Sequence, residues 1–284
     1  MVFRKLVFIS FLMLITASFV SATYISLSSS VDLERIVNST VAEANISIFN
    51  DGDEPAYDVI VEPISYQGIN AEQVMLGTIN PNSTAVGTIT LQVDENSVPG
   101  KYAIGLLIRY NDLNNYPFTF VTPVTFFYQT PVQSNVVGLL NELEIAGDET
   151  QEMILTIQNR DYKPHDVTIK LYTPNQISVD EAEKKITLQQ SSESTVTFQV
   201  SSLGALPGGN FFVFATIDYE EDGMHCSAIS SNGRIITAKE RSFMGMLVPL
   251  IIVVVAVLIV VLIITQLRSS KPGAAKKNIP RKSE

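Results

Sequence analysis

The sequence predicts an all-β protein in which two antiparallel β-sandwiches in tandem are followed by a single transmembrane helix. Apolar and polar residues alternate with a period of two along most of the chain. The same pattern of turn residues occurs twice, about 109 residues apart. A run of 24 residues without a charge lies near the C-terminus.

Residues 1–22 have the features of a secretory signal peptide. Arg4 and Lys5 precede an apolar stretch that ends at the small residues Ser21 and Ala22. We expect cleavage after Ala22. The alternative is an uncleaved N-terminal anchor, which the shortness of the apolar stretch disfavours.

Between the two ends of the chain, strands are predicted by alternation such as Ile46 and Ile48, or Met153, Leu155 and Ile157. Alternation of this kind lets one face of an antiparallel strand pack on a core while the other faces water. Turn residues, many of them Gly, Pro, Asn and Asp, interrupt the apolar runs at short spacing. We therefore expect seven strands in each sandwich.

Four pairs of residues mark an internal repeat. Three pairs are offset by 109 and one by 108: Asn50 and Asn159, Pro55 and Pro164, Tyr110 and Tyr219, and finally Pro99 and Pro207. A repeat of this length fits a domain better than a solenoid unit. We place sandwich 1 at residues 23–131 and sandwich 2 at residues 132–241, with a short Pro-containing linker at their boundary.

Structural roles explain these anchors without catalysis. We expect each Asn to occupy a turn because it tolerates a left-handed backbone, and Pro55 and Pro164 to begin the next strand. The Pro-Gly turns lead into long strands. Tyr110 and Tyr219 are expected to bury their rings while their hydroxyl groups reach the backbone.

The first half of the chain contains a characteristic order of elements: a strand, an Asn-Asp-Gly turn, a Pro-Ala-Tyr-Asp-Val strand, a Pro-Gly-x-Tyr strand and a final Tyr-Asn-Asp. The second half contains a looser copy of this order. This order resembles the Ig-like modules of prokaryotic surface proteins, namely the cell-adhesion-related domain of bacteria and archaea and the Ig-like domain associated with α-galactosidases. The resemblance implies an extracellular, often archaeal, role in adhesion, spacing or envelope assembly. It supplies no catalytic residues. The second copy departs from the pattern where Arg160 and Asp161 replace Asp-Gly.

Residues 244–267 form the predicted transmembrane helix, because at about 1.5 Å per residue they exceed a hydrocarbon layer of about 30 Å. The tail at 268–284 holds six lysines and arginines against one glutamate. By the positive-inside rule, the tail is cytoplasmic and the sandwiches are extracellular. The predicted localisation is the cell membrane, as a single-pass type I protein with the lipid bilayer as one partner.

The segment 23–243 is strongly acidic, with 11 lysines and arginines against 28 aspartates and glutamates and a net charge near −17. Such a surface repels phosphate backbones, which excludes ordinary nucleic-acid binding. Cys226 is the only cysteine, so an internal disulfide is excluded. Together with His165 and His225 it forms too small a set for a structural zinc site.

We assign no catalytic, cofactor-binding or metal residues, and we expect a protein that is not an enzyme. His165 and Asp166, like His225 and Cys226, are chain neighbours and should point to opposite faces of a strand. The second pair could serve as a metal or redox site, and Cys226 could form an intermolecular disulfide. Calcium is a weak candidate at acidic loops. These loops contain Asp51, Asp53 and Glu54; Asn111, Asp112 and Asn114; and Glu220, Glu221 and Asp222.

Three sequons are candidate glycosylation sites, at Asn38, Asn45 and Asn82. Asn45 lies within a predicted strand, where alternation with Ile46 places it on the outer face. The chain has no Trp, the commonest sugar-stacking residue. Three tyrosines could substitute weakly: Tyr66, Tyr116 and Tyr128.

The expected function is therefore binding or structural, as a membrane-anchored protein of a prokaryotic cell envelope with a protein or glycan partner. One alternative is an accessory subunit of a membrane complex, such as a transporter, a secretion channel or glycosyl-transfer machinery. A carbohydrate-active enzyme is a more distant alternative, because no paired carboxylates can be assigned.

Overall fold

The computed structural model describes residues 24–33, 36–231 and 233–238, together with six single residues between 253 and 264. The chain divides into two compact units, at 1–238 and 239–284. The predicted signal peptide and tail, and most of the predicted span at 244–267, lie outside the described residues. Among the residues that are described, no helix has the length and apolar character needed to cross a bilayer.

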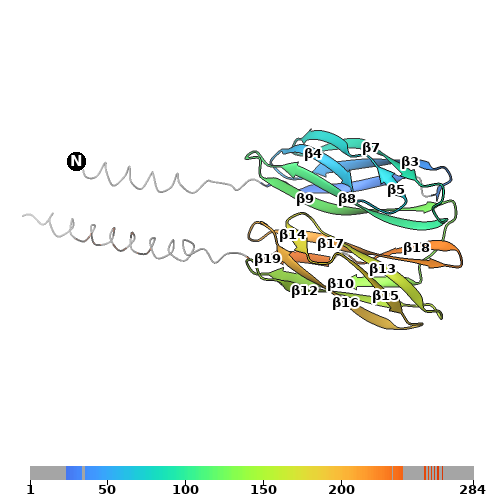
Figure 1. Cartoon of the computed structure of the whole chain (residues 1–284). Coiled ribbons are helices and arrows are strands. Elements are labelled where there is room, and N and C mark those ends of the chain that lie inside the picture. Colours follow the sequence, from blue (N-terminus) through green and yellow to red (C-terminus); the bar gives the residue numbers. More distant parts are fainter. Residues whose placement is uncertain are drawn as a thin grey trace, which may run out of the picture. The chain divides into compact units, whose positions relative to one another are not determined.

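The described part of the first unit is all-β, as predicted, and consists of two β-sandwiches (Figure 1). We call residues 24–128 the N-terminal sandwich and residues 136–238 the C-terminal sandwich. In the N-terminal sandwich, one sheet has the order β1-β3-β7-β5 and the other contains β2, β9, β8, β4 and β6. The strands are β1 (Leu27–Leu33), β2 (Ile36–Val37), β3 (Val41–Asn50), β4 (Ala56–Pro63), β5 (Ile69–Ala71), β6 (Val74–Ile79), β7 (Ser83–Val93), β8 (Gly100–Asn111) and β9 (Pro117–Tyr128).

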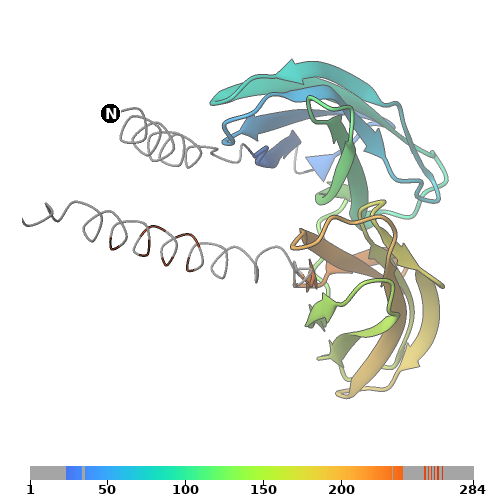
Figure 2. The same cartoon turned by 90° about the vertical axis from the view of Figure 1, so that its left-hand side faces the viewer.

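The C-terminal sandwich repeats this order. One sheet runs β10-β12-β16-β14, and β11, β19, β17, β13 and β15 belong to the other, with β18 also pairing with β17. The strands are β10 (Val136–Leu140), β11 (Glu142–Ile145), β12 (Gln151–Asn159), β13 (His165–Tyr172), β14 (Ile177–Val179), β15 (Glu183–Leu188), β16 (Glu193–Ser202), β17 (Asn210–Glu221), β18 (Met224–Ile229) and β19 (Gly233–Thr237). Figure 2 shows the facing layers of the sandwiches.

The described strands differ from the expectation in number and direction. There are nine in the N-terminal sandwich and ten in the C-terminal one, rather than seven, because several two- to four-residue segments pair along the sheet edges. Three of the described pairings, β2 with β9, β11 with β19 and β18 with β8, are parallel. The other described pairings between strands are antiparallel, as predicted.

Each sandwich has its own apolar core. Ile46 and Ile48 of β3 are fully buried in one core, and Met153 and Leu155 of β12 are fully buried in the other. The intervening residues of both strands are mostly exposed or half-buried. Alternation of apolar and polar residues therefore identified the core faces of these strands.

Asn50 and Asn159 lie where β3 leads into β4 and where β12 leads into β13, two equivalent connections that we call the corners. Their side chains stabilise these corners by hydrogen bonds. The amide of Asn50 donates to the carbonyl groups of Glu54 and Ile79, and its Oδ1 accepts from Gly52 N at 3.0 Å. Asn159 makes the same three bonds, to Lys163 O, Gln189 O and Asp161 N. Both side chains are buried, and neither residue has a positive φ. The expected left-handed backbone conformation was wrong. Each position instead uses the Asn side chain, which supplies both a buried hydrogen-bond donor and a buried acceptor.

The other anchors mostly follow expectation. Pro55 and Pro164 immediately precede β4 and β13. Tyr219 is buried, and its hydroxyl accepts a hydrogen bond of 3.0 Å from Asn135 N. Tyr110 instead stacks on Phe118, with ring centroids 5.4 Å apart. Pro207 lies in the turn before β17.

Cys226 lies in the core of the C-terminal sandwich with no exposed surface. Burial raises the pKa of its thiol. The intermolecular disulfide that the sequence left open is inconsistent with this buried position. We predict that a thiol-specific reagent labels Cys226 of the native protein at least about a hundredfold more slowly than the unfolded protein, because labelling requires local opening. Labelling at equal rates in the two states would contradict this placement.

One sheet continues through both sandwiches. The peptide of His225 in β18 pairs with Gly100 at the start of β8, and His225 N donates to Pro99 O at 2.9 Å. Gly100 has φ +146°, and a Cβ at this position would lie 2.0 Å from the carbonyl oxygen of His225. Only glycine fits here. The Pro99-Gly100 anchor, which the sequence suggested was a turn, is therefore the docking point for the second sandwich.

Candidate functional site: a recess between the sandwiches

An apolar cluster fills the centre of the contact between the sandwiches. Val121 of β9 packs with Tyr172 and Phe214 of the C-terminal sandwich, and the two aromatic rings stack with centroids 4.8 Å apart. A Cβ on Gly105 would lie 2.4 Å from the ring of Tyr172, so the strand and the ring are in close contact. The two halves thus share a small core of their own.

Polar contacts surround this cluster. The hydroxyl of Thr119 donates to Gln176 Oε1 at 2.7 Å and accepts from Asn175 N at 2.8 Å. Tyr116 donates its hydroxyl proton to Gly204 O, and Lys170 Nζ donates to Ser65 O at 2.8 Å. Each of these bonds joins one sandwich to the other. Their directionality favours a single docked arrangement.

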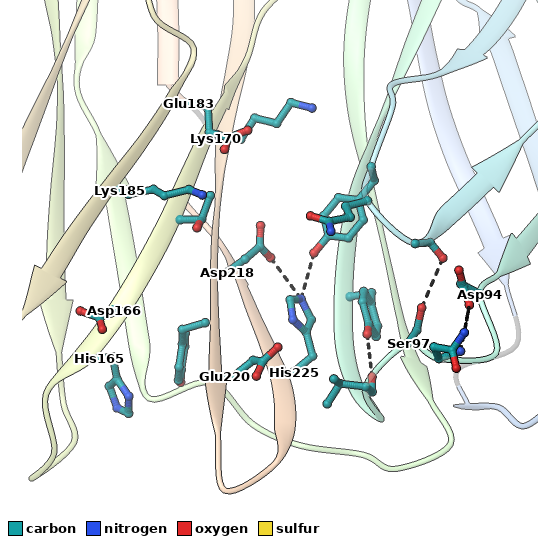
Figure 3. A pocket seen from close by; sticks show the side chains of 18 of the residues that line it. Asp94, Ser97, His165, Asp166, Lys170, Glu183, Lys185, Asp218, Glu220 and His225 are labelled. Atoms are coloured by element: carbon teal, nitrogen blue, oxygen red, sulfur yellow. Dashed lines mark hydrogen bonds and ion pairs between the residues drawn. The ribbon is translucent and has the colours of Figure 1, made fainter.

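A recess of about 1160 Å³ opens beside the contact. The N-terminal sandwich contributes the β4–β5 loop, the β7–β8 loop and Tyr102, and the C-terminal sandwich contributes β13, β15, β17 and β18. Figure 3 shows Asp94 and Ser97 on one side, Lys170 and Lys185 on the other, and His225 between them. We call this space the inter-sandwich recess.

The recess is built around His225. Its ring stacks on Tyr102, with centroids 4.3 Å apart and planes 18° from parallel. Its Nε2 shares a hydrogen bond of 2.9 Å with the hydroxyl of Tyr66 and lies 3.6 Å from Asp218 Oδ1. Thr216 donates to the other oxygen of Asp218. Side chains of both sandwiches therefore form one polar network.

The lining is rich in hydrogen-bonding groups and net acidic. It contains five carboxylates against two lysines, along with serine, threonine and tyrosine hydroxyl groups and two side-chain amides. Burial, reinforced by Asp218, raises the pKa of Tyr66, and burial raises the pKa of Tyr102 to about 12. Both phenols are therefore neutral hydrogen-bonding groups at physiological pH.

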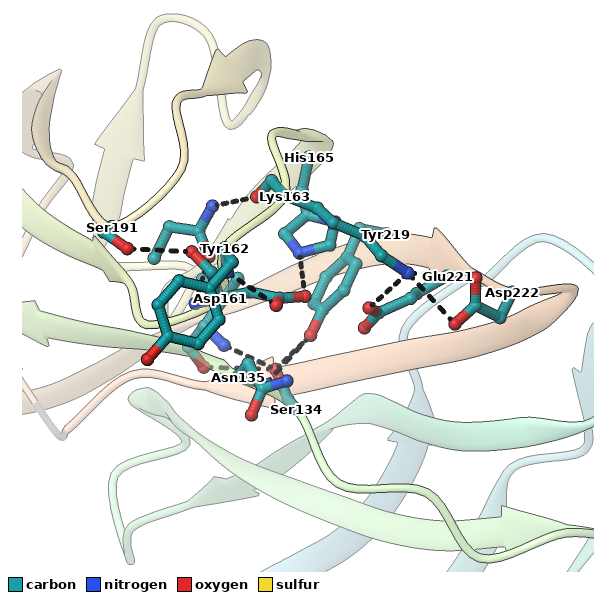
Figure 4. A network of polar contacts seen from close by, with 12 residues as sticks. Ser134, Asn135, Asp161, Tyr162, Lys163, His165, Ser191, Tyr219, Glu221 and Asp222 are labelled. Carbon is teal, nitrogen blue, oxygen red and sulfur yellow. Dashed lines mark hydrogen bonds and ion pairs between the residues drawn. The ribbon is translucent and has the colours of Figure 1, made fainter.

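A second polar group lies where β12, β13 and the β17–β18 hairpin meet (Figure 4). Ligand atoms of Asp161, His165 and Glu221 all lie within 4.8 Å of one another. His165 Nε2 is 3.1 Å from Asp161 Oδ2, and the ring of Tyr219 packs on the imidazole with centroids 4.5 Å apart. Lys163 Nζ lies 3.7 Å from Glu221 Oε1. This group has the composition of a metal-ligand set.

The pKa values of the two carboxyl groups in this cluster shift in opposite directions. Burial raises the pKa of Glu221, and the adjacent Asp161 raises it further. Hydrogen bonds to Glu221 and to the backbone of Tyr162 lower the pKa of Asp161. Two carboxyl groups in contact cannot both ionise freely unless a positive charge lies nearby.

The structure places the candidate glycosylation residues at the surface. Asn38, Asn45 and Asn82 are all exposed, and Asn45 lies on the outer face of β3 as expected. Asn82 has φ +54° in the turn before β7. Exposure is compatible with modification of all three.

Several residues of the acidic loops expected as weak calcium candidates accept hydrogen bonds or pair with a lysine within the protein. Asp53 accepts from Tyr24 N, and Asp112 accepts from Asn114 N and Tyr116 N. Asp222 pairs with Lys163. Glu221 alone of these residues belongs to a potential ligand set among the described residues.

Of the three tyrosines considered for sugar stacking, only Tyr66 lines the recess. Tyr128 is buried and presents no face to a ligand. Tyr116 is half-buried and bonded to Gly204. As expected, Cys226 and His225 point to opposite faces of β18, since one is in the core and the other in the recess.

Sequence reasoning missed Tyr102, Asp218 and the Asp161–His165–Glu221 group. Tyr102 reaches His225 only when the sandwiches dock, whereas Asp218 lies beside His225 because β17 pairs with β18. No local sequence pattern marks either residue. The Asp161–His165–Glu221 group could have been found by comparing the two copies of the repeat. Asp161 and His165 stand at the positions of Gly52 and Ala56 in the first copy, so chemistry-bearing side chains replace the smallest ones.

No family model matches this chain, and no curated protein matches it. Among solved structures, it is similar to a mutant of Salmonella α2-macroglobulin, at 12% identity and a TM-score of 0.31, over 75% of this chain and 16% of that chain. It is similar to Escherichia coli α2-macroglobulin in its native conformation, at 11% identity and a TM-score of 0.31, over 75% and 17% of the two chains. A protein of unknown function from Porphyromonas gingivalis matches at 11% identity and a TM-score of 0.27, over 72% and 99%.

The chain thus spans about a sixth of the macroglobulins' length. At these TM-scores, the likeness carries no argument about function. The expected relationship to adhesion-related and α-galactosidase-associated Ig-like domains stays a prediction.

Proposed function

We propose that this protein is a membrane-anchored, extracellular binding and structural protein of a prokaryotic cell envelope. Its two sandwiches act as one arm, and the inter-sandwich recess binds a segment of a glycan or protein partner. The arm is held to the membrane by the span at 244–267, with the basic tail in the cytoplasm. The apolar run and the tail's positive charge support this topology.

The observation that carries the proposal is the composite recess. Its volume of about 1160 Å³ exceeds the range of about 300–1,000 Å³ for small-molecule pockets, which suits one segment of an extended chain. Its lining offers carboxylates, lysines, hydroxyl groups and amides, which are the groups that bind sugar hydroxyls or polar peptide. A partner held there contacts both sandwiches at once.

Binding without turnover is supported by the chemistry around His225. A catalytic tyrosine base requires a lowered pKa, whereas burial and Asp218 raise the pKa of Tyr66. The hydrogen-bonding partner of the imidazole is thus a poor proton acceptor. These groups are suited to orienting a ligand by hydrogen bonds.

A recess variant tests the proposal. Thr168 is half-buried in the recess wall, and Thr156 is half-buried on β12 in the opposite sheet. We expect detergent-solubilised full-length protein to bind isolated envelope fragments from its own cells. Thr168→Trp should weaken this binding at least tenfold, and Thr156→Trp should leave it unchanged. Equal binding by both variants would contradict a binding role for the recess.

A copurification experiment addresses the accessory-subunit alternative. Native mass analysis after mild detergent extraction should give the chain without a stoichiometric membrane-protein partner. Recovery of one defined transporter, secretion or glycosyl-transfer complex would favour that alternative.

A further inference from the structure

We propose that Asp161, His165 and Glu221 form a binding site for a divalent transition-metal ion of the Zn²⁺ class in the C-terminal sandwich. Two of the three residues lie where β12 leads into β13, and the third lies at the end of β17. Asp161 lies in the loop after β12, His165 is the first residue of β13, and Glu221 is the last residue of β17.

The backbone holds two of the three ligands in place. Asp161 N donates to the buried Asn159 side chain, and Asp161 Oδ1 accepts from Tyr162 N at 2.7 Å. The remaining oxygen, Oδ2, faces His165 Nε2. The side chain of His165 is 4% exposed, and packing against Tyr219 fixes the plane of its ring. Such positioning reduces the ordering that a bound ion would require.

The distances suit a shared ion. Two ligands that each lie about 2.0–2.1 Å from zinc are roughly 3.0–3.4 Å apart when they occupy neighbouring positions. The observed distance between His165 Nε2 and Asp161 Oδ2 is 3.1 Å. Glu221 comes from the end of a strand, and its carboxylate oxygen lies within 4.8 Å of the other two ligand atoms. Binding of a shared ion would draw this oxygen closer to them.

The ligand types select the class of metal. One imidazole nitrogen and two carboxylate oxygens suit zinc and similar ions, and two negative charges balance one divalent cation. Calcium prefers six to eight oxygens, and an imidazole is a poor ligand for it. The site also leaves a coordination position for water or a partner's side chain.

Lys163 does not prevent occupancy. Its ammonium group approaches Glu221 to 3.7 Å, but its side chain is 56% exposed and also pairs with Asp222 at 3.2 Å. Exposed ion pairs contribute little free energy. A divalent ion can therefore displace this contact while Lys163 keeps Asp222.

The first copy of the repeat lacks such a site. The residues corresponding to Asp161, His165 and Glu221 at an offset of 109 are Gly52, Ala56 and Asp112. The ligand set is thus a feature of the second copy alone. In that copy, an ion would join the β12–β13 corner to the β17–β18 hairpin, whose second strand pairs with Gly100.

Zinc titration of tag-free, EDTA-treated full-length protein in detergent tests the site. We expect one saturable Zn²⁺ per chain by calorimetry and no comparable Ca²⁺ binding. Glu221→Gln and Asp161→Asn should each weaken Zn²⁺ binding at least tenfold. Glu220→Gln, which makes the same charge change at an exposed neighbour on the other face of β17, should leave it within about twofold. Unchanged binding in both ligand variants, or no saturable binding to the wild type, would overturn the proposal.

X-ray absorption at the zinc edge of the wild-type protein provides a test that does not depend on variants. The expected spectrum contains one imidazole and otherwise oxygen ligands. A spectrum with no imidazole, or with sulfur from Cys226, would also overturn it.

Discussion

Replacing Gly100 with alanine is expected to separate the two sandwiches and to lower the free energy of unfolding by about 3 kcal/mol. The new Cβ would lie 2.0 Å from the carbonyl oxygen of His225 and 2.7 Å from its nitrogen. Because both contacts are with backbone atoms, no side-chain rotation relieves them. The positive φ of Gly100 adds strain for any other residue. Chemical denaturation of the full-length protein, followed by circular dichroism, measures the loss.

Gly77→Ala is the matched control for this change. Gly77 also has a positive φ, at +73°, but a Cβ there would meet nothing within 4 Å. It should therefore cost only about 1 kcal/mol, from backbone strain alone. Equal losses in the two variants would show that contact with His225 contributes nothing.

Asn50→Asp and Asn159→Asp are each expected to destabilise the protein by about 3–5 kcal/mol. In either corner, the amide group donates to two carbonyl oxygens. A carboxylate has the same shape but places negative oxygen against those carbonyls while remaining buried. Denaturant unfolding at pH 7 measures the effect.

Asn45→Asp is the control for the same chemical change on β3. Asn45 is exposed, and its Oδ1 accepts from Thr88, a bond that a carboxylate keeps. The free energy of unfolding should fall by no more than about 0.5 kcal/mol.

The two corner substitutions should also make stability depend on pH. Burial raises the pKa of the introduced carboxyl in the folded state above its unfolded value. The protonated form is therefore the one the fold tolerates, and stability is lost as pH rises from the unfolded pKa of about 3.9 through the folded pKa. A deficit that is the same at pH 4 and pH 7 would argue against burial of the corner.

The sequence was sufficient to predict the β-sandwiches because burial imposes a two-residue period that is visible in β3 and β12. It also located the corners, since Asn50 and Asn159 recur at one offset. The sequence could not show how the two asparagines stabilise the corners. The second carbonyl group that each amide reaches, in Ile79 or Gln189, lies about 30 residues away along the chain.

The recess could not be predicted from the sequence either, because residues far apart along the chain form it. Tyr66 and His225 are 159 residues apart and meet only when the sandwiches dock. Counting only cysteine and histidine as zinc ligands left Asp161 and Glu221 out of the metal assignment. The replacement of Gly52 and Ala56 by acid and imidazole in the second copy was the available signal.

A distance measurement across the two sandwiches tests the central claim that they act as one unit. Val86 on β7 and Leu139 on β10 are exposed, one in each sandwich. The full-length double variant Val86→Cys and Leu139→Cys can be spin-labelled while Cys226 stays buried. Pulsed electron paramagnetic resonance should give one narrow distance distribution, which broadens when Gly100→Ala is added. A broad distribution without Gly100→Ala would mean that the sandwiches move independently, and it would contradict the account.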